Sequence, residues 1–271
     1  MDIKLWNKNI PEYQPNFHQP EPFMTAYFAS GSTPLPAILI CPGGGYVGLA
    51  EHEGRGIARH YVEKGFHCFV LSYRLTPYKA PLPLLDAQRA LKLLHYHARE
   101  YNIDAAKIFV MGFSAGGHLA ATLLTMKNIK RTRDKIDQQP LDLAGGILCY
   151  PVISMREDIT HAGSVRSLLG YKPTFYARRK WSADENVTEK TPPCFIWHTA
   201  DDGSVSVANS LRMAGALSDH NVPVELHVFP HGRHGLGLLD EEPDVVRWGD
   251  WARQWMDKRC DEIDKGKNHV F

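Results

Sequence analysis

The chain has 271 residues, of which 44% are hydrophobic, and its 31 basic and 30 acidic side chains give a formal net charge of +1. The balanced charge excludes a general electrostatic attraction to nucleic acid or to an anionic membrane. No apolar run approaches the roughly 20 residues of a membrane-spanning helix, and the N-terminus lacks a signal-peptide pattern. We therefore expect a cytoplasmic protein that forms one domain over residues 1–271, without a nucleic-acid or membrane partner.

The cysteines point to the same compartment. They are odd in number, include no C-x-x-C pair, and mostly lie in or beside apolar runs: Cys41, Cys68, Cys149, Cys194 and Cys260. Buried, reduced thiols explain this distribution. A nucleophilic cysteine would have no supporting neighbours in the sequence.

Short apolar runs alternate with longer helical patterns along the chain. After one expected antiparallel strand near residues 23–29, the runs predict strands at 36–41, 66–73, 107–112, 145–150, 194–199 and 224–229. These runs are nearly continuous in apolar residues, as in strands buried on both faces of a parallel sheet. Helical patterns lie between them, at about 52–64, 83–101, 115–126, 207–218 and 245–258. The alternation predicts an α/β fold, with a mostly parallel, doubly wound sheet and helices on both faces.

Residues 154–190 interrupt this alternation. The segment is longer than an ordinary connection, and connections of that length in compact domains are commonly lids or binding segments. It is rich in cationic and aromatic side chains: Arg156, His161, Arg166, Tyr171, Phe175, Tyr176, Arg178, Arg179 and Trp181. Its length and its break with the pattern therefore favour a lid or a binding segment.

The stretch KIFVMGFSAGGHLAATLL contains the pentapeptide G-x-S-x-G, with Ser114 at its centre. A strand pattern precedes the pentapeptide and a helix pattern follows it. A nucleophilic serine needs this arrangement, because a sharp strand-to-helix turn exposes its hydroxyl, and small residues on either side allow close packing. The motif and its flanks together predict that Ser114 is a nucleophile.

A nucleophilic serine needs a base, and the base is oriented by an acid. In this kind of fold the acid and then the histidine follow the serine along the chain. Asp201 and Asp202 follow one predicted strand, and His231 and His234 follow the next, at the strand ends where sites gather. We expect Asp202 as the acid, since Gly-Ser-Val-Ser-Val follows it, and His234 as the base, since small residues follow it. His231 is expected to be structural, and no metal site is expected, because no further ligands cluster with the two histidines.

The stretch PAILICPGGGYVGL has two interpretations. Gly43, Gly45 and Gly48 fit the G-x-G-x-x-G spacing that lets the backbone approach the pyrophosphate of a dinucleotide. That interpretation requires a helix that begins inside the motif, whereas the helical pattern starts near Glu51. Arg74 follows the next strand and suits a 2′-phosphate, which keeps an NADP-dependent oxidoreductase as an alternative. The second interpretation is a turn that aims backbone N–H groups at a developing oxyanion.

Several stretches together resemble the α/β-hydrolase superfamily. They are CPGGGY, YRLTP with PLPLLDAQRAL, GFSAGGHLA, TPPCFIWHTADD and FPHGRHGLGL, and the resemblance spans residues 36–256. The chain is most similar to the bacterial esterase/lipase group related to hormone-sensitive lipase and to acetylxylan and feruloyl esterases. Pro42 replaces the histidine of the usual His-Gly-Gly-Gly, as in the acetylxylan-esterase-like branch. Gly203 and Ser206 replace two prolines that commonly follow the acid.

The resemblance implies an α/β-hydrolase fold and a serine carboxylesterase. Its catalytic residues would be Ser114, Asp202 and His234. The N–H groups expected to bind the oxyanion are those of Gly44, Gly45 and Ala115. The family hydrolyses short-chain esters, often acetyl groups on sugars, through an acyl-enzyme. No cofactor or metal ion is expected.

The resemblance also bears on the substrate side. The insert 154–190 would be the cap or substrate segment, and its aromatic side chains either stack on a sugar ring or pack the insert onto the sheet. Tyr46 either lines the acyl pocket, as a substrate-binding residue, or covers the core. Capping or ion pairing explains Glu53 and Asp86 without chemistry. The expected partner is a small-molecule ester such as an acetylated carbohydrate, and a homo-oligomer is compatible with the sequence.

Other functions are weaker interpretations of the same residues. A peptidase of prolyl-oligopeptidase type has the same triad order, but the chain lacks room for that family's large extra domain. A non-catalytic receptor with this fold would be expected to have lost triad members, all of which are present here. Nothing in the sequence resembles the paired carboxylates of a glycosidase site.

Overall fold

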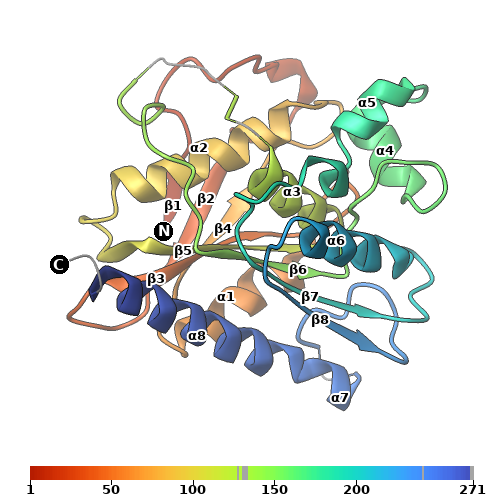
Figure 1. Cartoon of the computed structure of the whole chain (residues 1–271). Coiled ribbons are helices and arrows are strands. Elements are labelled where there is room, and N and C mark those ends of the chain that lie inside the picture. The colour runs from red at the N-terminus through yellow and green to blue at the C-terminus, as the bar shows by residue number, and fades with distance from the viewer. Residues whose placement is uncertain (127, 130–133, 240, 269–271) are drawn as a thin grey trace.

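A computed structural model describes residues 1–126, 128–129, 134–239 and 241–268. The strands are β1 (Asp2–Lys4), β2 (Phe23–Tyr27), β3 (Leu35–Cys41), β4 (His67–Ser72), β5 (Ile103–Phe113), β6 (Gly145–Cys149), β7 (Cys194–Thr199) and β8 (Val224–Phe229). They form one sheet in the order β1-β2-β4-β3-β5-β6-β7-β8 (Figure 1). The strands from β3 to β8 pair in parallel, whereas β1 and β2 pair antiparallel. The expected mostly parallel sheet, with an antiparallel strand near the N-terminus, is confirmed.

Helices cover both faces of this sheet. The helices are α1 (Arg55–Val62), α2 (Leu82–Tyr96), α3 (Ser114–Thr125), α4 (Ala162–Leu169), α5 (Phe175–Lys180), α6 (Ala208–Asp219), α7 (Pro243–Val246) and α8 (Trp248–Asn268). The 3-10 turns are η1 (Pro15–Phe17), η2 (Glu51–Glu53) and η3 (Ala183–Asn186). In Figure 1, α2, α3 and α6 lie over one face, and α1 and α8 lie under the other. Among the described residues, no helix combines the length and the apolar character needed to cross a bilayer.

Each face of the sheet has its own apolar core. Leu91 of α2 and Leu119 of α3 are buried together on one face. On the other face, Tyr61 of α1 packs with Trp248 and Met256 of α8. The nearly continuous apolar strands follow from this arrangement, because every second side chain of a central strand enters one core and the rest enter the other.

The ends of several elements differ from the sequence expectations. Strand β5 begins at Ile103 rather than at residue 107. Residues 104–107 are partly or fully exposed and form no apolar run, so the apolar pattern does not reveal this part of the strand. Helix α2 ends at Tyr96 rather than at 101, and turns lead from there back to the sheet. Helix α1 begins at Arg55 rather than at 52, after the separate turn η2. The short, exposed strand β1 was not expected.

The four loops that matter for function leave the same edge of the sheet. Cys41 at the end of β3 pairs with Gly112 of β5, and Thr199 at the end of β7 pairs with Phe229 of β8. Parallel strands that end in register release their following loops side by side. The glycine-rich loop, the serine turn and the loops after β7 and β8 therefore converge.

The insert 154–190 lies at this edge, beside α6 (Figure 1). Asn209 of α6 is fully buried and fastens the start of the insert. Its Oδ1 accepts the N–H groups of Ile153 (2.9 Å) and Ser154 (3.1 Å), and its Nδ2 donates to the Ile159 carbonyl (2.9 Å). Trp181 is buried, whereas three other aromatic side chains of the insert are exposed: Tyr171, Phe175 and Tyr176. Packing therefore accounts for Trp181 but not for these three.

The cysteines match the expectation from the sequence. All five are free, and four of them are buried. Burial raises the pKa of Cys194 to about 12, and Cys260 has a similarly raised pKa of about 12. Thiols with such pKa values stay protonated and are poor nucleophiles.

Candidate active site

Ser114 stands at the junction of β5 and α3. Its φ of +53° lies in the left-handed region that non-glycine residues rarely adopt, so the turn from strand to helix is sharp. A Cβ on Gly112 would lie 2.2 Å from the Gly116 carbonyl oxygen, and a Cβ on Gly116 would lie 2.1 Å from the Cys41 carbonyl oxygen. Glycine at these positions therefore allows α3 to pack directly behind the serine.

The imidazole of His234 reaches the serine from the loop after β8. Its Nε2 lies 2.8 Å from Ser114 Oγ, and its Nδ1 lies 2.6 Å from Asp202 Oδ2. The carboxylate can only accept a hydrogen bond, so Nδ1 carries the proton in the neutral ring. Nε2 is then the acceptor for the serine hydroxyl. The structure thus brings Ser114, His234 and Asp202 into one chain of hydrogen bonds.

Asp202 is held as a buried carboxylate. Its side chain is fully buried, and its Oδ1 accepts the N–H groups of Ser204 (2.8 Å) and Val205 (2.9 Å). Burial alone would raise the pKa of Asp202, but hydrogen bonds from His198, His234 and the Val205 N–H outweigh it and hold the pKa well below its usual range. Asp202 therefore carries a negative charge beside the imidazole.

The neighbouring pair of acid and histidine lies outside this chain of hydrogen bonds. Asp201 Oδ2 is 2.9 Å from His231 Nδ1, and the two side chains are 50% and 80% exposed. Asp201 also accepts the Gly232 N–H at 2.9 Å, so it links the loop after β7 to the loop after β8. In the described ranges, no group of three or more His, Cys, Asp or Glu side chains is arranged to hold a metal ion.

The glycine-rich loop lies directly against Ser114. A Cβ on Gly43 would lie 3.0 Å from Ser114 Cβ. Gly44 and Gly45 have φ values of +126° and +63°, which favour glycine. Within the described part of the chain, the N–H groups of Gly44, Gly45 and Ala115 donate no hydrogen bond, and Ala115 lies in the first turn of α3. These three amides therefore stay candidates to bind an oxyanion.

A buried carboxylate joins this loop to the histidine loop. Glu53 Oε2 accepts the Gly43 N–H at 2.7 Å, and its Oε1 accepts the Tyr150 hydroxyl at 2.7 Å. The same Tyr150 oxygen accepts the Gly237 N–H at 2.9 Å, and the Tyr150 ring meets the His234 ring edge to face at 5.0 Å. Glu53 is thereby more than a capping or ion-pairing residue, which is all that its sequence position indicated.

A family model described as BD-FAE matches residues 26–217, which is most of the chain. The chain belongs to the BD-FAE family. The resemblance to the bacterial esterase/lipase group is confirmed, and the sheet and helices have the α/β-hydrolase fold of the structural neighbours.

The relatives of this BD-FAE member are named as hydrolases. It is 37% identical over 252 residues to the endo-1,4-β-xylanase B of Butyrivibrio fibrisolvens, which covers 89% of this chain and 39% of that protein. It is 32% identical over 207 residues to the acetylxylan esterase of Xylanibacter ruminicola, covering 74% of this chain and 41% of that protein. The chain thus spans about two fifths of the length of these curated relatives. The crystal structure of an acetyl ester-xyloside bifunctional hydrolase from Caldicellulosiruptor lactoaceticus has a TM-score of 0.91 at 42% identity, covering 95% of this chain and 96% of that chain.

Tyr46 lies beneath the glycine-rich loop, in the core. Its side chain is buried in the core, where its hydroxyl lies 2.8 Å from His118 Nδ1, and His118 Nε2 lies 2.7 Å from the Trp181 carbonyl oxygen. Burial lowers the pKa of His118 to about 4, so the ring is neutral at pH 7. The imidazole can then donate to Trp181 and accept from Tyr46. The ring of Tyr46 packs in the core and does not face the solvent, which supports the second of its two expected roles; the substrate-binding role stays a prediction.

Sequence reasoning did not single out His198 or Tyr150, which support the site from behind, and it gave Glu53 only a capping or ion-pairing role. His198 is fully buried, with Nδ1 2.7 Å from Ser210 Oγ and Nε2 2.9 Å from the Val205 carbonyl oxygen. A histidine inside the buried strand CFIWHT is a detectable signal, because a buried polar group needs partners. Glu53 and Tyr150 offer no such signal, since they are distant in sequence and meet only in the fold.

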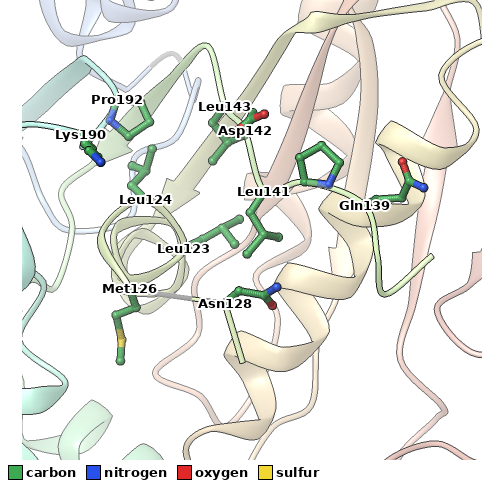
Figure 2. A pocket seen from close by; sticks show the side chains of 11 residues that line it. Leu123, Leu124, Met126, Asn128, Gln139, Leu141, Asp142, Leu143, Lys190 and Pro192 are labelled. Carbon is green, nitrogen blue, oxygen red and sulfur yellow. The ribbon is translucent and has the colours of Figure 1, made fainter. Parts of the chain in front are cut away.

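A separate hollow lies at the C-terminal end of α3 (Figure 2). Its volume is about 360 Å³, and its lining residues are Leu123, Leu124, Met126, Asn128, Gln139, Pro140, Leu141, Asp142, Leu143, Lys190 and Pro192. Ser114 begins α3 and Thr125 ends it, so at 1.5 Å per residue the two ends are roughly 17 Å apart. This hollow contains none of the groups that surround Ser114.

Proposed function

We propose that this BD-FAE member is a serine carboxylesterase that hydrolyses short-chain esters, acetyl esters above all, on sugars or xylan fragments. The observation that carries the proposal is the chain of hydrogen bonds from Ser114 through His234 to Asp202, with distances of 2.8 and 2.6 Å. The substrate class is taken from two relatives, which are named an acetylxylan esterase and an acetyl ester-xyloside bifunctional hydrolase.

In the acylation step, Ser114 Oγ attacks the ester carbonyl carbon while His234 Nε2 takes the hydroxyl proton. A bond forms between Oγ and carbon, and the carbonyl π electrons move onto the oxygen. The N–H groups of Gly44, Gly45 and Ala115 bind that oxyanion. Collapse of the intermediate breaks the bond to the alcohol oxygen, which takes the proton from His234. The acyl group stays on Ser114.

In the deacylation step, water attacks the acyl carbon and gives its proton to His234 Nε2. The second tetrahedral intermediate expels Ser114 Oγ, which regains the proton, and the carboxylic acid leaves. Asp202 keeps the imidazole in the productive tautomer and stabilises the imidazolium in both steps. These steps need no cofactor and no metal ion.

Glycoside hydrolysis would need a different arrangement. It uses one carboxyl group that gives a proton and a second that acts as base or nucleophile. Both oxygens of Glu53 accept hydrogen bonds, from Gly43 and Tyr150, and Asp202 accepts hydrogen bonds from His234 and two backbone amides. These carboxylates are occupied, so we propose ester cleavage alone for this site, although two relatives are named as xylan or xyloside hydrolases.

Turnover of p-nitrophenyl acetate and labelling by a fluorophosphonate probe test the proposal. The wild-type chain should do both, Ser114→Ala should do neither, and Ser218→Ala, on the exposed side of α6, should behave as the wild type. Unchanged turnover by Ser114→Ala would refute the assignment. Faster cleavage of a dipeptide amide than of an acetyl ester would favour the peptidase alternative, and a fluorescence change on titration of a reduced nicotinamide would favour the oxidoreductase.

A further inference from the structure

The insert reaches the site through one histidine. His161 precedes α4 and caps that helix, because its Nδ1 accepts the Ser164 N–H at 3.2 Å and lies 2.9 Å from Ser164 Oγ. An imidazole nitrogen that accepts a backbone N–H is unprotonated, so the neutral ring carries its proton on Nε2. This Nε2 has no hydrogen-bond partner among the residues that the structure describes.

The ring of His161 borders the glycine-rich loop. A Cβ placed on Gly45 would lie 4.0 Å from His161 Cε1 and 3.9 Å from Val47 Cγ2. The Gly45 Cβ position is therefore close both to an imidazole ring that carries an N–H donor and to an apolar side chain that is 65% exposed. The Gly45 N–H is one of the three amides proposed to bind the oxyanion, so an ester bound in that way would place groups near His161 and Val47.

Electrostatics agree with this placement. Burial lowers the pKa of His161, and the nearby imidazole of His234 lowers it further, whereas the charge of Asp202 raises it. His161 thus interacts electrostatically with both His234 and Asp202, and its imidazole is neutral at pH 7. A neutral ring keeps one N–H donor and adds no positive charge beside the catalytic imidazole.

We propose, on the basis of the function proposed above, that His161 and Val47 form the subsite for the alcohol part of the substrate. His161 Nε2–H donates to a hydroxyl oxygen on the carbon next to the ester, and Val47 packs against the C–H surface of the same ring. The substrate class is therefore a partly acylated cyclic polyol, such as a pyranose with a free hydroxyl beside its acetyl group.

The chemistry of the substrate decides which part meets His161. The carbonyl oxygen of the ester is taken by the three amides, and an acetyl methyl group has no acceptor atom. The remaining acceptors of an acetylated sugar are the hydroxyl and ring oxygens of its alcohol part. A donor beside an apolar wall matches such a ring, which has polar edges and apolar faces.

Two acetates that differ by one hydroxyl group test this inference. The kcat/KM of trans-1,2-cyclohexanediol monoacetate is divided by that of cyclohexyl acetate for wild type, His161→Ser and His220→Ser. Serine is a favoured N-cap residue, so His161→Ser keeps the cap of α4 but removes the imidazole Nε2–H that reaches toward the substrate. His220 is an exposed histidine at the end of α6 and provides the matched control. We expect a ratio of roughly three to ten in wild type and His220→Ser, as for one neutral hydrogen bond, and a ratio near one in His161→Ser.

The outcomes separate this inference from the proposed function. A ratio that is the same in His161→Ser as in wild type would overturn it, even if both rates fell, because a structural role lowers both rates alike. A wild-type ratio near one would overturn it as well. If the wild type hydrolysed none of these substrates, p-nitrophenyl acetate included, the proposed function itself would fail. Val47→Ala should lower kcat/KM for both cyclohexyl substrates and keep the wild-type ratio; a change in the ratio would contradict the role given to Val47.

Discussion

Replacement of Glu53 by glutamine tests whether the link between the two loops serves the site or only the fold. Glu53→Gln preserves the shape of the side chain but removes its charge and replaces one acceptor oxygen by an NH₂ group. Glutamine can accept from either the Gly43 N–H or the Tyr150 hydroxyl, and its NH₂ group then faces the other donor. The Tyr150 oxygen already accepts the Gly237 N–H, so the tyrosine has little freedom to reverse its bond.

The size of the effect follows from the contacts that are lost. A hydrogen bond to a charged group contributes about 1.5–3 kcal/mol, and one such bond disappears in a site that is closed to solvent. We therefore expect the free energy of unfolding to fall by about 2 kcal/mol. Gly43 precedes two of the proposed oxyanion donors, so its release should displace them. Complete loss of one donor costs about 10²–10³ in kcat, and a displaced loop should cost about 10–100-fold.

Urea unfolding and p-nitrophenyl acetate kinetics measure the two effects separately. Asp86→Asn is the matched control, since Asp86 is an equally buried carboxylate that pairs with Arg74 at 2.7 Å instead of with the loops. This control should lower stability, by about 3–5 kcal/mol for a broken buried pair, and leave kcat of the folded fraction near the wild-type value. A wild-type kcat in Glu53→Gln, with reduced stability, would refute the reasoning.

Three further predictions concern groups around the same site. Asp202→Asn should lower kcat by about 10⁴-fold, through the wrong imidazole tautomer, whereas Asp201→Asn should leave it near the wild-type value; equal losses in the p-nitrophenyl acetate assay would contradict the choice of acid. Gly116→Ala should yield no active enzyme, because its Cβ would lie 2.1 Å from the Cys41 carbonyl oxygen; a soluble variant with wild-type kcat would be inconsistent with that contact. The pKa of His118 is lowered by burial from 6.5 to about 4, so its contribution to stability is complete above pH 6.5 and is lost as the pH falls toward 4. The free energy of unfolding should therefore fall by about 3 kcal/mol as the pH falls through this range. His118→Gln should show a smaller fall between pH 7 and pH 4.5 in urea unfolding; the same pH dependence in both proteins would argue against this role of His118.

The sequence was most informative where a structural feature is local. The strands at 194–199 and 224–229 have the bounds expected from the sequence. Every residue of β7 is buried, as its uninterrupted apolar run indicated, whereas β8 at the edge of the sheet is only partly buried. The serine turn was equally clear, because close packing of α3 restricts Gly112 and Gly116 to small residues. Element ends were less predictable: α2 stops at Tyr96 although its apolar pattern continues, because the chain must turn back to reach β5.

By itself, the sequence determined most of the strands and helices in their order along the chain, the position of the serine turn and the candidates for acid and base. Each of these depends on neighbours within a few residues. Only the tertiary structure decided that Asp202 rather than Asp201 meets His234, that Tyr46 is buried, and that Glu53 joins two loops. Ser114 and His234 are 120 residues apart, and Glu53 and Tyr150 are 97 residues apart. The order of strands in the sheet decides whether residues so far apart in sequence meet in space, and no local pattern of residues records that order.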